Sequence, residues 1–325
     1  MKIALALIGI SALASALWFF MYDSEERYPV EEDFSDVEML FERFGLRTDT
    51  RIRNVALDQI FSGGPGKDGI PALSDPIFTT VSEADVDGET LGVLVIIEEV
   101  KRFYPYTILV WHEIVNDHIG DTHFAVTFCP LCGSAIVFDR NVDGDILSFG
   151  VSGLLFESNL LMYDSATESL WSQAGNEAVV GTYTGTRLSV LPMRLLTFSS
   201  LQFEYPDAQI LSQDTGYVRR YGIDPYTGYG LSEDLYFPVS VSDKRFPAKE
   251  IFYVFPYKEK SIAFPEKSLI DTANFSIGDT TVTATRHTDG IAITTEDNTV
   301  LPGYYEMWFS WATHHQEDGV VWEIE

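Results

Sequence analysis

Short runs of β-branched and aromatic residues recur along most of the chain from Thr90 onward, each bounded by turn-forming residues. Examples are "YTILVWHEIV", "HFAVTF", "AIVFDR", "LLMYD", "IAITTE" and "YYEMWFSWAT". Runs of this length and composition are typical of β-strands. The pattern predicts a mainly β (β-rich α+β) fold, with one large antiparallel β domain and few short helices.

Two segments follow the helical period instead. In the first, Val37, Leu40, Phe41 and Phe44 share one face, and Gly45 is placed to end the helix. The second is "PMRLLTFSSLQFEY", residues 192–205. Between the strands, "YDSATESLW" predicts a hairpin with residues 164–169 at its tip, and the glycine- and proline-rich residues 62–76 predict a loop.

The N-terminal segment is apolar from Ile3 to Tyr22, with Lys2 before it and acidic residues after it. Twenty apolar residues suffice to cross a bilayer, and the flanking charges place the remainder outside the cytoplasm. Cleavage near Ala14 would leave the apolar residues 17–20 at a new terminus. We therefore favour an uncleaved anchor over a signal peptide and expect an exported protein, membrane-anchored and facing the periplasm or exterior, or secreted if the segment is cleaved. The predicted division is an anchor or signal segment (1–22), an acidic stalk with a short helix (23–50) and a single β-rich domain (51–325).

The charge balance excludes one class of partner. The chain has 49 acidic residues against 21 lysines and arginines, a formal net charge of −28. Tracking a phosphate backbone requires clustered basic residues, so we expect no nucleic-acid partner. The partner that the sequence does predict is the membrane, through the N-terminal segment.

The only two cysteines, Cys129 and Cys132, lie in "TFCPLCGSA". Outside the cytosol such a pair tends to be oxidised or bound to a metal. A thioredoxin-like pair requires a helix after the first cysteine, but a strand is predicted after Gly133. A disulfide would close a very small loop and stabilise little. In the favoured interpretation, a metal knuckle, Pro130 fixes the backbone after the first ligand, Gly133 permits a left-handed turn after the second, and backbone amides hold the first sulfur as thiolate. A buried, reduced structural pair remains the further alternative.

Ligands that complete a metal site must come from histidine, methionine or carboxylate. His112 ends a predicted strand that a hairpin would bring beside the cysteine strand, and Met162 offers a soft thioether. His123 shares a face with Cys129 but lies about 20 Å away along a regular strand. His314 and His315 are adjacent in a predicted strand, so at most one could serve. The predicted set is Cys129, Cys132, His112 and Met162, binding copper or zinc, with copper preferred because the donors are soft.

Several segments occur together and in order: "SGGPGKDGIPALSDP", "LVWHEIVND", "VTFCPLCGSAIVFDR", "SNLLMYD", "SLWSQAGNEAVVG" and "EMWFSWATHH". This succession resembles an exported bacterial and archaeal family catalogued only as a domain of unknown function. The resemblance extends from about Arg51 to the C-terminus. It implies a single unit with the cysteine motif at its centre and supplies no activity.

Two functions are therefore carried forward. The first is an extracytoplasmic metal-binding protein centred on the knuckle, with a role in metal handling, electron transfer or redox chemistry. The second is a non-enzymatic envelope binding module, such as a glycan-binding one, in which the cysteines form a disulfide or an inert pair. The sequence leaves open whether the protein is an enzyme.

Overall fold

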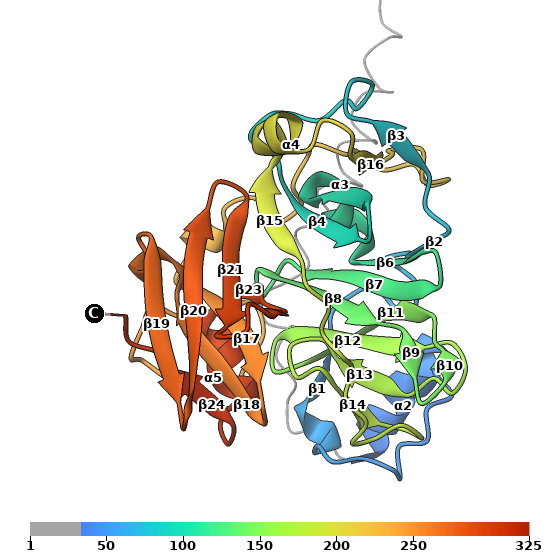
Figure 1. The fold of residues 1–325 in the computed structure, drawn as a ribbon. Coiled ribbons are helices and arrows are strands. Elements are labelled where there is room, and N and C mark those ends of the chain that lie inside the picture. The colour runs from blue at the N-terminus through green and yellow to red at the C-terminus, as the bar shows by residue number, and fades with distance from the viewer. Residues whose placement is uncertain (1–33, 325) are drawn as a thin grey trace, which may run out of the picture.

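A computed structural model describes residues 34–324 of the protein (Figure 1). The predicted anchor at 1–22 and the first part of the stalk lie outside the described residues. Within 34–324, no helix has the length and apolar content needed to cross a bilayer.

The strands form five sheets, and an eight-stranded mixed sheet contributes to both of the large hydrophobic cores. In spatial order the strands of this central sheet are β2 (Leu73–Ser74), β6 (Ile114–Ile119), β7 (Thr122–Cys129), β8 (Ser134–Asp139), β23 (Tyr304–Met307), β17 (Ile251–Tyr257), β18 (Lys260–Pro265) and β24 (Gly319–Val321). Two of its pairings, β2 with β6 and β18 with β24, are parallel and the others are antiparallel.

Four further sheets complete the β structure. The first five-stranded sheet is β1 (Ile60–Ser62), β11 (Phe149–Phe156), β12 (Asn159–Asp164), β13 (Leu170–Ser172) and β14 (Glu177–Val180). The second is β15 (Arg194–Thr197), β4 (Leu91–Ile97), β5 (Val100–Pro105), β16 (Gln209–Leu211) and β3 (Phe78–Thr80). The others are β19 (Thr272–Ile277), β20 (Thr280–His287), β21 (Gly290–Thr295) and β22 (Val300–Leu301), and the pair β9 (Asn141–Val142) and β10 (Asp145–Ile146).

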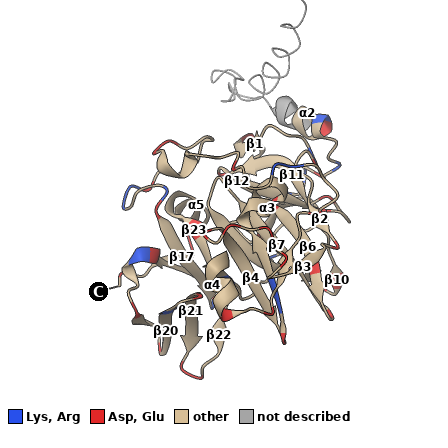
Figure 2. Ribbon diagram, turned by 90° about the horizontal axis from the view of Figure 1, so that it is seen from above, with Lys and Arg blue, Asp and Glu red and all other residues tan. Residues whose placement is uncertain are grey.

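Helices are short and lie between strands. The described α-helices are α2 (Phe34–Phe44), α3 (Tyr106–His112), α4 (Phe198–Glu204) and α5 (Trp308–His314), and the 3₁₀ turns are η1 (Leu57–Gln59), η2 (Tyr229–Leu231) and η3 (Glu266–Ser268). Acidic positions are spread over loops and strand ends of many elements (Figure 2).

The two faces of the central sheet bury different cores because side chains alternate along a strand. On β7, Phe124, Val126 and Phe128 enter one core together with α3, β4 and the β19–β22 sheet. Ala125 and Cys129 enter the other, which we call the cysteine-side core. That core also contains residues of β11–β13 and of α5. The alternation therefore directs the first cysteine to the interior, between the central sheet and the β1–β11–β12–β13–β14 sheet.

Most of the sequence-based prediction of the fold is confirmed. The fold is β-rich with short helices, α2 ends before Gly45 as expected, and residues 164–169 connect β12 to β13. The second helix was predicted over residues 192–205 but begins only at Phe198, because residues 194–197 form β15. Thr197 caps this helix, α4, by accepting a hydrogen bond from the Ser200 amide.

Two predicted strands are wrong. Residues 106–112 and 308–314 are the helices α3 and α5. Both are buried on nearly all sides, so packing in the cores overrides the strand preference of their aromatic and β-branched residues. A short segment with apolar residues at nearly every position shows neither the two-residue period of a strand nor the 3.6-residue period of a helix. Its hydrophobic pattern therefore does not distinguish a buried helix from a buried strand.

Gly153 lies where the register of β11 against β12 shifts, and there the backbone of β11 contacts the 62–76 loop. Its carbonyl accepts a hydrogen bond from the Gly63 amide at 2.8 Å, and its φ is +80°. A Cβ added there would lie 2.1 Å from the Pro65 carbonyl oxygen. The backbone of the loop and of β11 can approach this closely only when position 153 is glycine.

We expect Gly153→Ala to lower the free energy of unfolding by more than about 3 kcal/mol, because left-handed strain is added to a clash with backbone atoms. Gly185→Ala is the matched control: its φ is +88°, but no heavy atom lies within 4 Å of the added Cβ. That variant should lose only about 1 kcal/mol. Denaturant unfolding measures both, and equal losses would contradict the close approach.

Candidate functional site

The cysteine pair occupies the turn between β7 and β8. Cys129 is paired with Ser134 at the end of the ladder, and the Cys132 amide donates to the Cys129 carbonyl at 3.2 Å. Gly133 has a φ of +58°, which is the left-handed turn predicted after the second cysteine. The two Sγ atoms are 3.5 Å apart, both thiols are free, and the residues are 2% and 0% exposed. The pair is therefore a buried dithiol held by a knuckle-shaped turn.

Cys129 is the acidic member of the pair. Burial alone would raise its pKa, but the hydrogen bond with Cys132 and backbone hydrogen bonds from Leu160, Cys132 and Leu131 together lower it. Two of these amides belong to the turn itself, and the third comes from β12. Amide donors that converge on one sulfur stabilise its anionic form. These donors therefore outweigh the effect of burial and lower the pKa of Cys129.

Cys132 is the less acidic member. Burial and the hydrogen bond and negative charge of Cys129 raise its pKa well above the usual value. The Cys132 thiol donates to the Ser158 carbonyl at 3.3 Å. Asn159 Nδ2 donates to the same sulfur at 3.3 Å. The pKa values of the two thiols are therefore shifted in opposite directions.

A buried network of side chains holds Asn159 in place. Asn159 Nδ2 also donates to Gln173 Oε1 at 2.9 Å, and Ser134 Oγ donates to the same oxygen at 2.8 Å. Gln173 Nε2 donates in turn to Thr127 Oγ1 at 3.1 Å. All four residues are fully buried, so the network ties β7, β8, β12 and the end of β13 together beneath the knuckle.

Two buried carboxyl groups lie near the thiolate. Burial and the charge of Cys129 raise the pKa of Glu113 well above its usual range. Burial raises the pKa of Glu306 to about 8, with a further contribution from Cys129 and an opposing one from Ser310. Among the described residues, no ion pair joins either carboxyl to a lysine or arginine. Burial therefore favours the neutral form of both carboxyls.

His112, predicted as a ligand, has a different set of partners. It ends α3, and its ring nitrogens lie 2.7 Å from the Pro71 carbonyl and 2.7 Å from the Tyr221 hydroxyl. Burial lowers its pKa, so the ring is neutral. For His112 to bind a metal, one of these two hydrogen bonds would have to break.

Met162 shares the cysteine-side core with both cysteines and is fully buried on β12, opposite Trp171. His123 instead stacks near His118, with 5.3 Å between ring centroids. His314 and His315 follow each other at the end of α5 rather than in a strand. Among residues 34–324, no three histidine, cysteine or acidic side chains are grouped closely enough to hold a metal ion. The predicted ligands that the structure brings together in one core are therefore the two cysteines and Met162.

Residues 212–249, which we call the cover segment, form no strand and contain only the 3₁₀ turn η2. Burial and the charges of Glu113 and Cys129 raise the pKa of Tyr226, and burial and the charges of Cys132 and Cys129 raise that of Tyr229. Both tyrosines thus lie close to the cysteine pair. The hydrogen bond between His112 and Tyr221 fastens the cover segment to α3.

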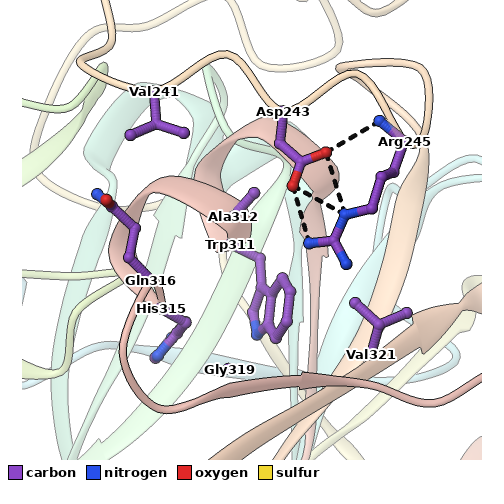
Figure 3. Close-up of a pocket in the computed structure, with 9 residues that line it drawn as sticks. All are labelled: Val241, Asp243, Arg245, Trp311, Ala312, His315, Gln316, Gly319 and Val321. Atoms are coloured by element: carbon purple, nitrogen blue, oxygen red, sulfur yellow. Dashed lines mark hydrogen bonds and ion pairs between the residues drawn. The ribbon is translucent and has the colours of Figure 1, made fainter.

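Two surface pockets flank α5. The smaller, of about 220 Å³, is lined by Trp311 and His315, with the ion pair of Asp243 and Arg245 at its side (Figure 3). The larger, of about 380 Å³, is lined by His314, Glu157, Ser172 and Gly175 among others. Glu157 precedes Ser158, whose carbonyl contacts Cys132, so the larger pocket comes within one residue of the site.

The sequence analysis missed the polar surroundings of the pair: Glu113, Asn159, Gln173, Glu306 and Ser310. Asn159 stands at the start of the apolar run "SNLLMYD", and Gln173 ends the run "SLWSQ". A side-chain amide that is buried at such a position needs a specific hydrogen-bond partner. Glu306 stands inside the apolar run "YYEMWF", and a lone acid in such a run was the available signal.

Comparison with known proteins gives one match. A family model described as "Protein of unknown function (DUF3179)" matches residues 67–300, which is more than half of the chain and includes both cysteines. Glu306 and α5 lie beyond the matched residues. No curated protein and no solved structure matches the chain.

The raised pKa of Glu306 makes stability depend on pH. The folded state keeps a proton that the unfolded chain loses above pH 4.5, so this group lowers stability as pH rises toward about 8, by roughly 1.4 kcal/mol per pH unit. The neutral variant Glu306→Gln lacks this loss. Relative to the wild type, its free energy of unfolding should rise by roughly 3 to 4 kcal/mol between pH 5 and pH 8.

Denaturant unfolding at several pH values tests this. Glu317→Gln, at an exposed position, is the control and should show a constant difference from the wild type. A difference for Glu306→Gln that does not change with pH would mean that Glu306 is ionised in the folded protein.

Proposed function

The chain belongs to the family described as "Protein of unknown function (DUF3179)", and we propose that it is an extracytoplasmic metal-binding protein that holds one monovalent copper ion between Cys129 and Cys132. The proposed extracytoplasmic location rests on the N-terminal sequence pattern. The proposed metal binding rests on the knuckle-shaped turn that holds the two cysteines.

One observation carries the proposal: a second sulfur lies 3.5 Å from that of Cys129, whose pKa is lowered by backbone amides of the same turn. Metal–thiolate bonds of about 2.3 Å span two sulfurs at this separation with little movement. Pre-formed ligands reduce the ordering cost of binding. The turn therefore has the shape of a binding site before the ion arrives.

The charges around the pair favour a cation. The two thiols and the carboxyls of Glu113 and Glu306 are all buried, and the charge of Cys129 contributes to the raised pKa of both carboxyls. Amide dipoles favour the anionic form of Cys129. A bound metal cation would take the place of the thiol protons between the two sulfurs.

Copper is preferred to zinc because of the donors. Two thiolates form a soft, electron-rich pair, which suits monovalent copper. The Met162 thioether, in the same core, is a soft third donor for copper. A structural zinc site would take four ligands, two more than the knuckle supplies.

We expect the reduced wild-type protein to bind one copper(I) ion and Cys129→Ser and Cys132→Ser to lose it, because each removes half of the sulfur pair. Metal analysis after anaerobic loading and gel filtration gives the stoichiometry, and circular dichroism shows that each variant is folded. A Cys129→Ser protein that keeps its copper contradicts the proposal. So does a wild type whose cysteines are bridged and which takes up no copper after reduction.

The role of Met162 is tested by Met162→Leu, which keeps the volume of the side chain but removes the sulfur. We expect its copper affinity to fall roughly tenfold or more, a loss typical of removing a supporting group at a metal site. Met193→Leu is the matched control, since Met193 is buried in the opposite core. Competition with a chromophoric copper(I) chelator measures the affinities. The companion variant His112→Gln should keep the wild-type affinity, and a loss there would show that the imidazole leaves Tyr221 for the ion.

A further inference from the structure

Two histidines face each other across the β6–β7 hairpin (Figure 1). His118 on β6 is the direct cross-strand partner of His123 on β7, and Ile119 pairs with Thr122 next to the two-residue turn. Gly120, the first residue of that turn, has a φ of +55°, which suits a two-residue hairpin. Residues directly opposite each other project from the same face of a sheet. The register therefore places both imidazoles side by side.

The pair occupies a position at which cross-strand side chains come close together. The His118 amide donates to Asp117 Oδ1 at 2.7 Å, and the His123 carbonyl accepts from the Arg140 amide at 3.0 Å. These backbone groups are directed away from the facing histidine, as in a pair that is not hydrogen-bonded across the ladder. The Cα atoms of such a pair are about 4.5 Å apart, and its side chains are closer than those of a hydrogen-bonded pair.

The separation of the two rings matches that of two ligands on one metal ion. The ring centroids of His118 and His123 are 5.3 Å apart, and the rings are inclined by 33°. Metal–nitrogen bonds of about 2.0 to 2.1 Å, with an angle of about 90° to 109° between them, place two imidazole centroids roughly 4.4 to 5.3 Å apart. The strands therefore already hold the rings at the spacing that a shared ion requires.

The ring nitrogens are available for a ligand. His118 Nδ1 donates to the Gly120 carbonyl at 3.3 Å, which leaves the lone pair of its Nε2 free. Metal-binding histidines commonly donate their second nitrogen to a carbonyl in this way. Within residues 34–324, no protein group forms a hydrogen bond with the His123 ring. His118 is exposed and His123 is half-buried, so an ion can approach both from solvent.

The charges near the pair do not oppose a cation. Arg140 is next to His123 in the ladder, but its guanidinium donates to the Leu147 carbonyl at 2.5 Å and to Ser148 Oγ at 2.7 Å, which hold it in place. Asp121 is exposed in the turn of the hairpin. The chain as a whole has a formal net charge of −28, and a field of this sign raises the local concentration of cations.

We propose that His118 and His123 form a separate metal site, which binds one divalent first-row transition-metal ion such as Ni²⁺, Cu²⁺ or Zn²⁺. Imidazole suits these ions, and strands fixed within the central sheet reduce the cost of ordering the ligands. With two protein ligands, the ion keeps open positions for water or for a donor of another molecule. The site lies six residues, or about 20 Å along β7, from Cys129, so the inference does not depend on copper binding by the cysteines.

The site is tested with Ni²⁺ as the probe, by isothermal titration calorimetry of the full chain. A salt concentration of about 0.15 M screens diffuse attraction to the acidic surface. His118→Gln and, independently, His123→Gln each remove one ligand. His287→Gln is the matched control, because His287 is also exposed at the end of a hairpin strand but is paired with Gly290. Circular dichroism shows that each variant is folded.

We expect the wild type to bind one Ni²⁺ through this pair, and each of His118→Gln and His123→Gln to bind it at least about tenfold more weakly, because the second imidazole no longer acts at a high effective concentration. His287→Gln should bind Ni²⁺ as the wild type does. Wild-type affinity in either ligand variant overturns the site and leaves the proposed function standing, since an ion bound at the cysteines would be kept. A wild type that takes up no Ni²⁺ also overturns it. So does an equal loss in His287→Gln, which would show that surface histidines in general bind the ion.

Discussion

The pairing of Cys129 with Ser134 at the end of the β7–β8 ladder sets the geometry of the whole interior. Because side chains alternate along β7, this register turns Cys129 into the core shared with β12 and α5, and Gly133 then closes the turn in the left-handed region. A shift of one residue would direct the sulfur to the opposite core and remove the amides of Leu131 and Leu160 from it. The strand register therefore determines where an anion is stabilised inside the protein.

The surroundings of the knuckle combine features that cost stability. Two buried carboxyls with raised pKa values and a buried pair of thiols lie in a core that aliphatic side chains could fill at lower free energy. A tight turn with two positive φ values adds backbone strain beside them. Concentrations of such features are characteristic of functional sites rather than of structural cores.

The strands and the shape of the turn could be predicted from sequence because they depend on local patterns. The β runs are short, rich in β-branched and aromatic residues and bounded by turn formers, the residues around Pro130 and Gly133 have defined backbone preferences, and α2 has a clear helical period. The residues around the pair could not be predicted in the same way. Glu306 and Glu113 reach it from β23 and from the end of α3, and α3 and α5 carry no period that distinguishes helix from strand. Their positions depend on tertiary packing. His112 illustrates the point, since its place in the chain suggested the metal site whereas its ring binds Tyr221.

The cover segment belongs to none of the five sheets of the described residues, although Tyr226 and Tyr229 lie close to the buried cysteine pair. Its outer surface includes Val218 and Leu231, which are 97% and 94% exposed. Strand pairing therefore places few demands on its sequence or length. This wall can be remodelled in evolution without disturbing the framework that holds the sulfurs. The position of the two cysteines and the shape of what covers them are thus separable traits in this architecture.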